Sequence, residues 1–466
     1  MVYFFIDSAV IFLASEQSWY SMMKRSTQSL LALSLTFSAT FVFAQPAPQN
    51  SATLYENVRV FDGTSEKLTP PTNVLVVNNL IKTISSKPIQ IPTGTTATVI
   101  SGGGRTLMPG LSDAHTHIWL TATMDEILKG DVKQLNAIAY ETAKVMLLNG
   151  WTTVRDMAGP VFQLKSDIDA GKVLGPRIYP SGTMISQTSG HGDFSFPEEL
   201  PRSFGGGLSI GEKLRISSVV DGRAQVLTAA RFNLRNGASQ IKLATSGGVS
   251  SADDTPTVQE FTSDEIKAAV EAASDFGTYV SVHAYNTASI RRSVDAGVKV
   301  IEHGQLLDEP TVKYLKNKDV WLSTQNFEEF HPPYTPFQIY KEHQVVMGED
   351  NVFKWALQNN VKLAWGTDFF FQPDGVVQNI QLAKMTKWMT PARALKMVTY
   401  DNAQLFALSG PRNPYTEGKL GVVKEGAYAD LLLVDGDPTQ NLEIIADPVK
   451  NFRVIMKDGK IFKNTL

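Results

Sequence analysis

The hydrophobic positions follow two different patterns, one at the ends of the chain and one in its middle. Near both ends, short runs rich in β-branched residues are bounded by Gly, Pro or Asn, as in LYENVRVFDG, NVLVVNNLIKTI, YADLLLVDGDP and FRVIMKDGKIFKN. Such runs are typical of strands joined by tight turns. Because the two flanks share this style, we expect one small β-sandwich domain built from both chain ends, residues 45–109 and 411–466.

Between these flanks, over residues 110–410, apolar strand-like runs alternate with helical segments. The eight runs are LMPGLSDAH, WTTVRDM, RIYPSGTMI, SQIKLAT, TYVSVHAY, VKVIEHG, VWLSTQN and VKLAWGTD. Two of the helical segments, SDEIKAAVEAASDFG and TASIRRSVDAG, end at a Gly, a common helix C-cap. Eight strands alternating with helices favour an α/β fold, a closed (β/α)8 barrel of the TIM type. The alternative is an open doubly wound sheet, but no Gly-rich phosphate loop follows the first strand.

The first 44 residues have the pattern of an export signal. Lys24 and Arg25 precede an uncharged, largely apolar stretch that ends at Ala44, and polar, Pro-rich QPAPQNS follows. This order describes a secretory signal peptide. The apolar run is shorter than the roughly 20 residues that a membrane-spanning helix needs. We therefore expect cleavage after Ala44, a periplasmic or secreted location and no membrane association afterwards. Residues 1–21 fit no part of such a signal, and we interpret them as a start-site artefact.

Charge and cysteine content limit the partners and the kinds of site that the chain can have. Lys and Arg number 43 against 46 Asp and Glu, so the chain has no basic excess to neutralise phosphates and no nucleic-acid partner is expected. There is no cysteine, which excludes thiol nucleophiles, disulfides, cysteine-ligated zinc and a lipoprotein anchor. Any metal must therefore be held mainly by His or carboxylate side chains.

Ligating residues fall where a barrel enzyme places its chemistry, at the C-terminal ends of the expected strands. A lone histidine is more often a hydrogen-bonded structural residue, and a lone aspartate could cap the following helix. Here, however, four of only seven histidines share one face with a lysine and an aspartate, which predicts a metal site. The six candidates are His115, His117, Lys242, His283, His303 and Asp368.

Lys242 is the most informative of the six. In QIKLA, strand alternation sends Ile241 and Leu243 outward to the helices and Lys242 into the barrel. An ammonium group there is costly unless it is neutralised or paired. One possibility is a salt bridge to Asp368 or Glu302. The other is reaction with carbon dioxide, because buried lysines lose their proton readily and the resulting carbamate anion can bridge two metal ions.

With these residues the chain resembles the amidohydrolase superfamily, in the subgroup whose two metal ions are bridged by a carboxylated lysine. The resemblance rests on PGLSDAHTH, Lys242 in QIKLA, His283 in VSVHAY, His303 in VIEHG and Asp368 in WGTD, and on the late segment GAYADLLLVDGDP. It covers nearly all of the mature chain.

The resemblance implies two divalent metal ions, with zinc as the default because imidazole and carboxylate ligands suit it. It also implies that Asp368 acts as general base and then as general acid. The implied ligands are His115, His117 and Asp368 for one ion, His283 and His303 for the other, and a carbamate on Lys242 between them.

The resemblance also narrows the substrate. Phosphotriesterase-like members lack the flanking sandwich, and imidazolonepropionase-like members lack the lysine. The remaining branch contains Xaa-Pro dipeptidase-like and ochratoxin-degrading amidohydrolases, so we expect cleavage of a linear amide in N-acyl amino acids or dipeptides, ochratoxin-type substrates among them. A cyclic-amide or lactone hydrolase is the alternative within enzymes. An inactive binding protein on the same fold would be expected to lack a ligand, and none is missing.

Four loop residues are candidates for binding this small-molecule amide or dipeptide substrate. Glycines flank His191, which could bind a carboxylate or carbonyl oxygen, and Tyr285 could donate to a developing oxyanion. Ser246 and Gly247 follow Lys242 and offer backbone N–H groups. Packing roles are equally compatible with His191 and Tyr285. Because relatives often assemble, a homo-oligomer is expected.

Overall fold

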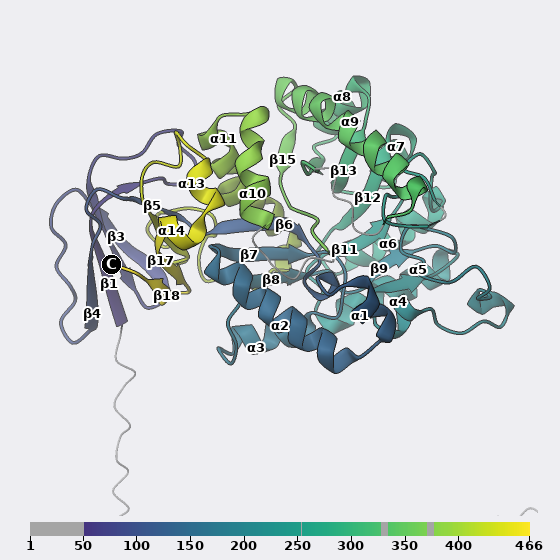
Figure 1. The fold of residues 1–466 in the computed structure, drawn as a ribbon, viewed down its shortest axis with the longest axis horizontal. Helices are drawn as coiled ribbons and strands as arrows, with labels where there is room; N and C mark the ends of the chain where they lie inside the picture. Colours follow the sequence, from purple (N-terminus) through teal and green to yellow (C-terminus); the bar gives the residue numbers. More distant parts are fainter. Residues whose placement is uncertain (1–50, 253, 328–333, 371–376) are drawn as a thin grey trace, which may run out of the picture. The chain divides into compact units, whose positions relative to one another are not determined.

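The computed structural model describes residues 51–252, 254–327, 334–370 and 377–466, so the predicted signal peptide lies outside the described residues. Strands and helices alternate through the middle of the chain, and strands from its two ends lie together (Figure 1). Within the described ranges, no helix combines the length and apolar character needed to cross a membrane.

Strands from the two ends of the chain form one sheet, in the order β18-β17-β16-β5-β1-β2-β3 with β4 beside β1. The two ends meet where β16 pairs antiparallel with β5 and Leu432 lies opposite Met108. Residues from both groups, among them Tyr55, Val74 and Met456, form one buried cluster. The strands are β1 (Ser51–Val60), β2 (Thr72–Val77), β3 (Leu80–Ser85), β4 (Thr96–Ser101), β5 (Thr106–Pro109), β16 (Leu431–Val434), β17 (Phe452–Lys457) and β18 (Lys460–Asn464).

The middle of the chain contributes two parallel sheets, one in the order β6-β7-β8 and one in the order β10-β9-β11-β12-β13-β14-β15. Each of the eight runs singled out from the sequence contains a strand, but the first, LMPGLSDAH, covers parts of both β5 and β6, which belong to different sheets. The strands are β6 (Leu111–Thr116), β7 (Trp151–Asp156), β8 (Arg177–Pro180), β9 (Met184–Ser186), β10 (Ser217–Val219), β11 (Ile241–Ala244), β12 (Val280–Asn286), β13 (Val300–Leu306), β14 (Trp321–Ser323) and β15 (Lys362–Ala364).

The third run differs from the expectation that it forms one continuous strand. RIYPSGTMI forms two strands, β8 and β9, which belong to different sheets. Gly182 lies between them with φ 78, a left-handed conformation that favours glycine, and a Cβ there would come within 2.6 Å of the Asn233 Oδ1 atom. The chain therefore turns at this glycine, where alternation alone predicted one continuous strand.

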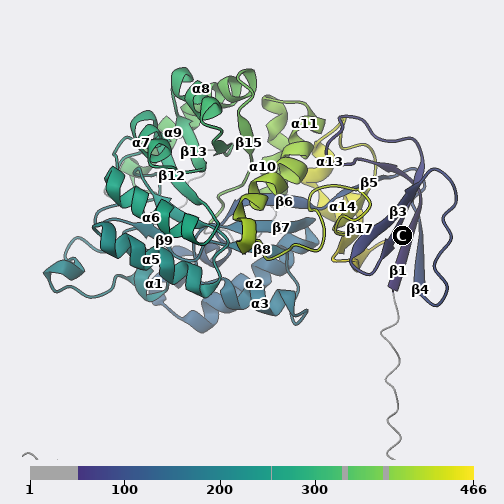
Figure 2. The same cartoon turned by 180° about the vertical axis from the view of Figure 1, so that it is seen from behind.

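Helices separate the strands and cover them (Figures 1 and 2). The outward residues Ile241 and Leu243 of β11 pack in one core with Ile266 and Ile290 of the helices, as alternation predicted. The helices are α1 (Met124–Lys129), α2 (Val132–Leu148), α3 (Phe162–Asp169), α4 (Ile210–Lys213), α5 (Arg223–Asn236), α6 (Ser263–Asp275), α7 (Thr287–Asp295), α8 (Glu309–Asn317), α9 (Pro336–Gln358), α10 (Val377–Ala383), α11 (Pro391–Lys396), α12 (Asn402–Phe406), α13 (Glu443–Ala446) and α14 (Pro448–Asn451), with shorter turns η1 (Ile118–Leu120), η2 (Arg202–Phe204), η3 (Lys384–Lys387), η4 (Met397–Asp401) and η5 (Ala407–Arg412).

Arg177 ties strand β8 to the C-terminal part of the chain. Its Nε donates to Asp430 Oδ2 at 2.9 Å and its Nη2 to Asp458 Oδ1 at 2.7 Å, and its guanidinium carbon lies 4.0 Å from the ring centre of Tyr428. Arg177 and Asp430 are both buried. Burial alone would lower the pKa of Arg177, but the neighbouring carboxylates, Asp430 first, together outweigh burial and raise the pKa above its ordinary value. This ion pair therefore depends on both partners.

We predict that Arg177→Met destabilises the protein by about 3–5 kcal/mol, because the buried Asp430 carboxylate loses its counter-charge. Urea unfolding at neutral pH measures the change. Arg231→Met is the matched control, since Arg231 is an exposed residue of α5, and it should change stability by less than about 0.5 kcal/mol. Equal stability of the two variants would contradict the role given to Arg177.

Candidate metal centre and substrate cavity

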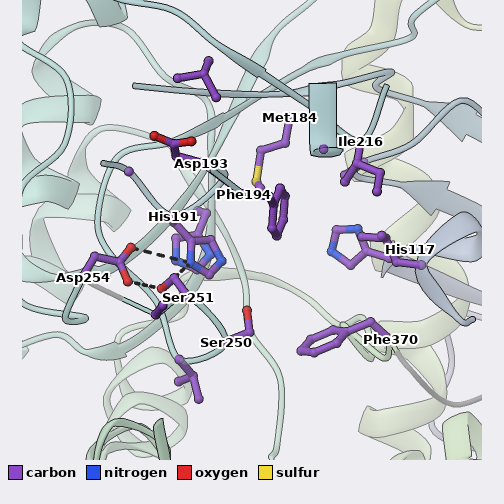
Figure 3. A pocket seen from close by; sticks show the side chains of 18 of the residues that line it. His117, Met184, His191, Asp193, Phe194, Ile216, Ser250, Ser251, Asp254 and Phe370 are labelled. Atoms are coloured by element: carbon purple, nitrogen blue, oxygen red, sulfur yellow. Dashed lines mark hydrogen bonds and ion pairs between the residues drawn. The ribbon is translucent and has the colours of Figure 1, made fainter. Parts of the chain in front are cut away.

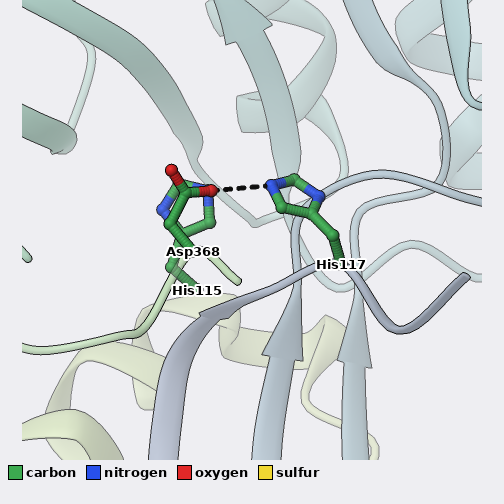
Figure 4. A group of neighbouring side chains, drawn as sticks. All are labelled: His115, His117 and Asp368. Carbon is green, nitrogen blue, oxygen red and sulfur yellow. Dashed lines mark hydrogen bonds and ion pairs between the residues drawn. The ribbon is translucent and has the colours of Figure 1, made fainter. Parts of the chain in front are cut away.

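The structure brings the predicted ligands of the first metal ion into contact. His115 is the second-last residue of β6, His117 directly follows the strand, and Asp368 lies in the segment after β15. The Nε2 atoms of His117 and His115 lie 3.0 and 3.3 Å from Asp368 Oδ1 (Figure 4). One ligand atom from each of the three residues can be chosen so that all lie within 4.8 Å of one another, a spacing that could hold a metal ion.

The other three candidates lie against this group. Lys242 Nζ is 3.2 Å from His115 Nε2. The ring centre of His303 is 5.0 Å from that of His115 and 4.4 Å from that of His283. Lys242, His283 and His303 are at most 3% exposed. All six residues singled out from the sequence therefore form one largely buried cluster toward the C-terminal ends of the parallel strands, with Lys242 inside β11.

The backbone turns sharply at two of the six residues. His303 has φ 74 and Asp368 has φ 55, a left-handed region that residues other than glycine rarely occupy. In β13, Glu302 faces inward, so regular alternation would send His303 outward. The left-handed residue breaks this alternation, and both neighbours reach the cluster. Such local strain is typical of functional sites.

Two residues that the sequence did not assign to the site hold the ligand histidines. Glu302 Oε2 lies 3.0 Å from His115 Nδ1, and Gln325 Oε1 lies 2.9 Å from His303 Nδ1. Each oxygen accepts from Nδ1–H, and this leaves Nε2 of the ring free to bind a metal. The sequence indicates Glu302 as a possible salt-bridge partner of Lys242. It pairs instead with Arg155, whose Nη2 donates to Glu302 Oε1 at 2.6 Å.

Asp113 is a third supporting residue that the sequence analysis did not single out. Its carboxylate accepts from the backbone N–H of His115 at 2.9 Å, the hydroxyl of Thr367 at 2.6 Å and the side-chain amide of Gln378 at 2.6 Å. Asp113 thus joins the strand that carries His115 to the segment that carries Asp368. Its position two residues before His115, on the same face of the strand, was a signal that could have identified it.

The electrostatics of the cluster fit metal ligation. Burial lowers the pKa of His115 to about 4 and the pKa values of His283 and His303 well below the usual range, so these rings are neutral. Burial alone would raise the pKa of Asp368, but the neighbouring histidines, His115 first, lower it below its ordinary value. Burial also lowers the pKa of Lys242 to about 8. Neutral imidazoles and an ionised carboxylate are the forms that bind metal ions.

A cavity of about 990 Å³ opens over this cluster. Most of its wall around the site is apolar, and Met184, Phe194, Ile216 and Phe370 contribute to it (Figure 3). The size falls within the range of small-molecule binding sites, which bury an apolar ligand and orient it through a few polar groups.

The four predicted substrate-binding residues divide into two pairs. His191 and Tyr285 line the cavity, and the Tyr285 ring stacks on His303 with centres 4.9 Å apart. Ser246 and Gly247 are not among the described residues that line it. The Ser246 hydroxyl donates to the Gly247 carbonyl and accepts from the Tyr285 N–H, so this pair contacts the site residues instead.

Parallel strands and the segments after them bring four histidines, a lysine and an aspartate together, which defines a candidate metal centre in an α/β fold. The Amidohydrolase family matches residues 106–462, and the chain belongs to this family. It is 31% identical to ochratoxinase of Aspergillus niger over 380 residues, which span 77% of this chain and 75% of that protein.

Two solved structures are similar over 89% of this chain and 100% of their own. One is a prolidase complexed with N-methylphosphonate-L-proline, with 28% identity and a TM-score of 0.81. The other is a Xaa-Pro dipeptidase with bound methionine, with 26% identity and a TM-score of 0.76. Together with the family match, these relatives identify the protein as a hydrolase that acts on amide bonds.

We predict that Glu302→Gln weakens metal binding about 10- to 100-fold, because His115 loses the charged group that orients its ring. Competition against a chelator measures the change. The variant should also lose about 3–5 kcal/mol of stability, since Arg155 becomes an unpaired buried cation.

Glu309→Gln is the matched control for this variant. Glu309 pairs with Lys313 on the surface of α8, and such pairs contribute at most about 1 kcal/mol. Unchanged metal affinity in Glu302→Gln would show that Glu302 supports the fold alone.

Proposed function

We propose that the protein is a binuclear metal-dependent amidohydrolase that cleaves a linear amide bond in N-acyl amino acids or dipeptides, ochratoxin-type substrates among them. The observation that carries this proposal is the single buried cluster of neutral imidazoles, ionised carboxylate and lysine beside a large apolar cavity. The similarity to an ochratoxinase and to dipeptidases supports the choice of a linear amide.

The proposal assigns each predicted ligand to one of the two metal ions or to the bridge between them. The residues that would hold the ions are His115, His117 and Asp368 for the first, and His283 and His303 for the second, with a carbamate on Lys242 between them. Zinc is the ion that this donor set favours. When bound, the ions would supply a hydroxide nucleophile at neutral pH and polarise the substrate carbonyl.

The chain's own groups would then move the proton and hold the substrate. The Asp368 carboxylate would accept the proton of the nucleophile and return it to the nitrogen that leaves, since an amine departs only when protonated. Tyr285 and His191 line the cavity and would contact the reacting amide or the amino-acid carboxylate. The surrounding apolar wall would exclude water from the acyl group.

We also propose that the two parallel sheets close into one (β/α)8 barrel and that the terminal strands form a β-sandwich. Backbone bonds between the two sheets support closure. Ala114 N–H donates to the Trp365 carbonyl at 3.0 Å, and Ser239 N–H donates to the Pro180 carbonyl at 2.8 Å. A closed barrel would explain why ligands from β6 and β13, which belong to different sheets, meet in one place.

Metal-loaded protein is expected to hydrolyse N-acyl amino acids or Xaa-Pro dipeptides, and Lys242→Ala should lower kcat/KM by about 100-fold or more through loss of the bridging group. The variant should also hold fewer metal ions, measured by elemental analysis, and lose the carbamate signal that ¹³C-bicarbonate gives in carbon NMR.

Lys267→Ala, which changes an exposed lysine of α6, should keep wild-type activity and metal content. Turnover of cyclic lactones or cyclic amides without turnover of linear amides would contradict the proposed function and support a cyclic-amide or lactone hydrolase instead. Full metal content and activity in Lys242→Ala would remove the lysine from the mechanism.

We propose in addition that the chain is exported and cut after Ala44. The support is the charged, apolar and small-residue order of the first 44 residues. N-terminal sequencing of the protein recovered from the periplasm or medium should begin at Gln45. Recovery of the uncut chain from the cytoplasm would contradict the proposal.

A further inference from the structure

His191 is held on several sides although it is not among the proposed metal ligands. Its ring stacks on the ring of His283 with centres 4.0 Å apart and planes 14° from parallel. Its backbone N–H donates to Glu260 Oε1 at 2.9 Å. A Cβ on Gly248 would come within 2.2 Å of the His191 ring, so only a glycine leaves room for the ring there. The ring is therefore confined to one place beside the cluster.

The remaining edge of the ring meets a short chain of polar groups. The Nδ1 atom lies 3.2 Å from the Ser251 hydroxyl and 3.8 Å from Asp254 Oδ2 (Figure 3). The Ser251 hydroxyl donates to Asp254 Oδ1, so its oxygen is left to accept from His191 Nδ1–H. With a proton fixed on Nδ1, Nε2 is the ring nitrogen available to a ligand in the cavity.

Helix α9 fixes this polar chain in turn. The buried Nζ of Lys341 donates to the backbone carbonyls of Ser251 at 2.6 Å and Asp254 at 2.9 Å, and lies 3.6 Å from Asp254 Oδ1. Three residues earlier on α9, Gln338 Nε2 donates to the Ser250 carbonyl at 2.6 Å. Ser250, Ser251 and Asp254 are thus attached to one face of the helix, and the lysine balances the charge of Asp254.

We infer that Ser251 and Asp254, attached to α9 through Lys341, are positioning residues for substrate binding. They fix the orientation and the tautomer of His191 so that Nε2 serves the amide substrate. The expected effect on KM rests on the proposed function. The proton on His191 Nδ1 does not depend on which substrate is bound. It assigns a role in substrate binding to a helix that supplies none of the proposed metal ligands.

Ser251→Ala is expected to raise KM for an N-acyl amino acid several-fold, up to about tenfold, while kcat changes less than twofold and metal content stays at the wild-type level. Ser251→Thr, which keeps the hydroxyl, should restore most of the loss. Ser274→Ala, which changes an exposed serine of α6, should leave both constants unchanged. A raised KM in Ser251→Ala that the threonine does not restore would contradict the role given to the hydroxyl.

A double-mutant cycle separates positioning from general damage. If Ser251 acts through His191, then Ser251→Ala adds no further loss in a His191→Ala background. Additive losses would overturn the inference, because they would mean that Ser251 acts independently of the ring. Asp254→Asn should behave like Ser251→Ala in the same cycle, with Asp264→Asn on the surface of α6 as its control.

Nitrogen NMR of the histidine-labelled protein gives a readout that needs no substrate. The His191 signal, assigned by its loss in His191→Ala, should show a proton fixed on Nδ1 in the wild type and a mixture of tautomers in Ser251→Ala. A wild-type protein with this signature but without amide hydrolysis would refute the proposed function and leave the ring orientation standing. Hydrolysis together with an Nε2-protonated ring would refute the inference alone.

Discussion

A fully buried ion pair between Arg155 and Glu302 underlies the geometry of the site. The Arg155 guanidinium also donates to the Ala114 carbonyl at 2.6 Å and the Tyr279 hydroxyl at 3.1 Å, and Glu302 reaches His115 and Ser281. One charged pair thereby connects β6 and β7 of one parallel sheet with β12 and β13 of the other, or their flanks. Burying two charges is costly, and the hydrogen bonds that both groups make with these neighbours, His115 among them, are required to offset the cost. The histidine orientation follows from this requirement.

The same low-polarity surroundings set the charge of the cluster. The cluster contains neutral imidazoles, an ionised Asp368 and a lysine whose pKa is lowered to about 8. Burial lowers the pKa of the lysine, whereas for Asp368 the neighbouring histidines outweigh burial and lower the pKa of the carboxyl. Neutral imidazoles beside an ionised carboxylate are suited to binding cations, and the lowered pKa favours the neutral amine of Lys242.

The sequence predicted what depends on regular alternation. Eight runs contain strands, and Lys242 points inward between Ile241 and Leu243. What it missed depends on departures from regularity. The turn at Gly182 divides one expected strand. The left-handed backbone at His303 lets Glu302 and His303 both face the cluster. Neither conformation can be derived from the two-residue period of a regular strand. Ser246 was placed at the cavity because its neighbour Lys242 belongs there, but its hydroxyl bonds with the backbone around it.

The pairing of β5 with β16 has a consequence for how the chain is made. Pro109 lies opposite Leu431, so one edge of an early strand has to wait for a partner that leaves the ribosome more than 300 residues later. Until then, this edge is open to pairing with other molecules. The nascent polypeptide thus gains from chaperone protection during synthesis, and its final assembly is post-translational.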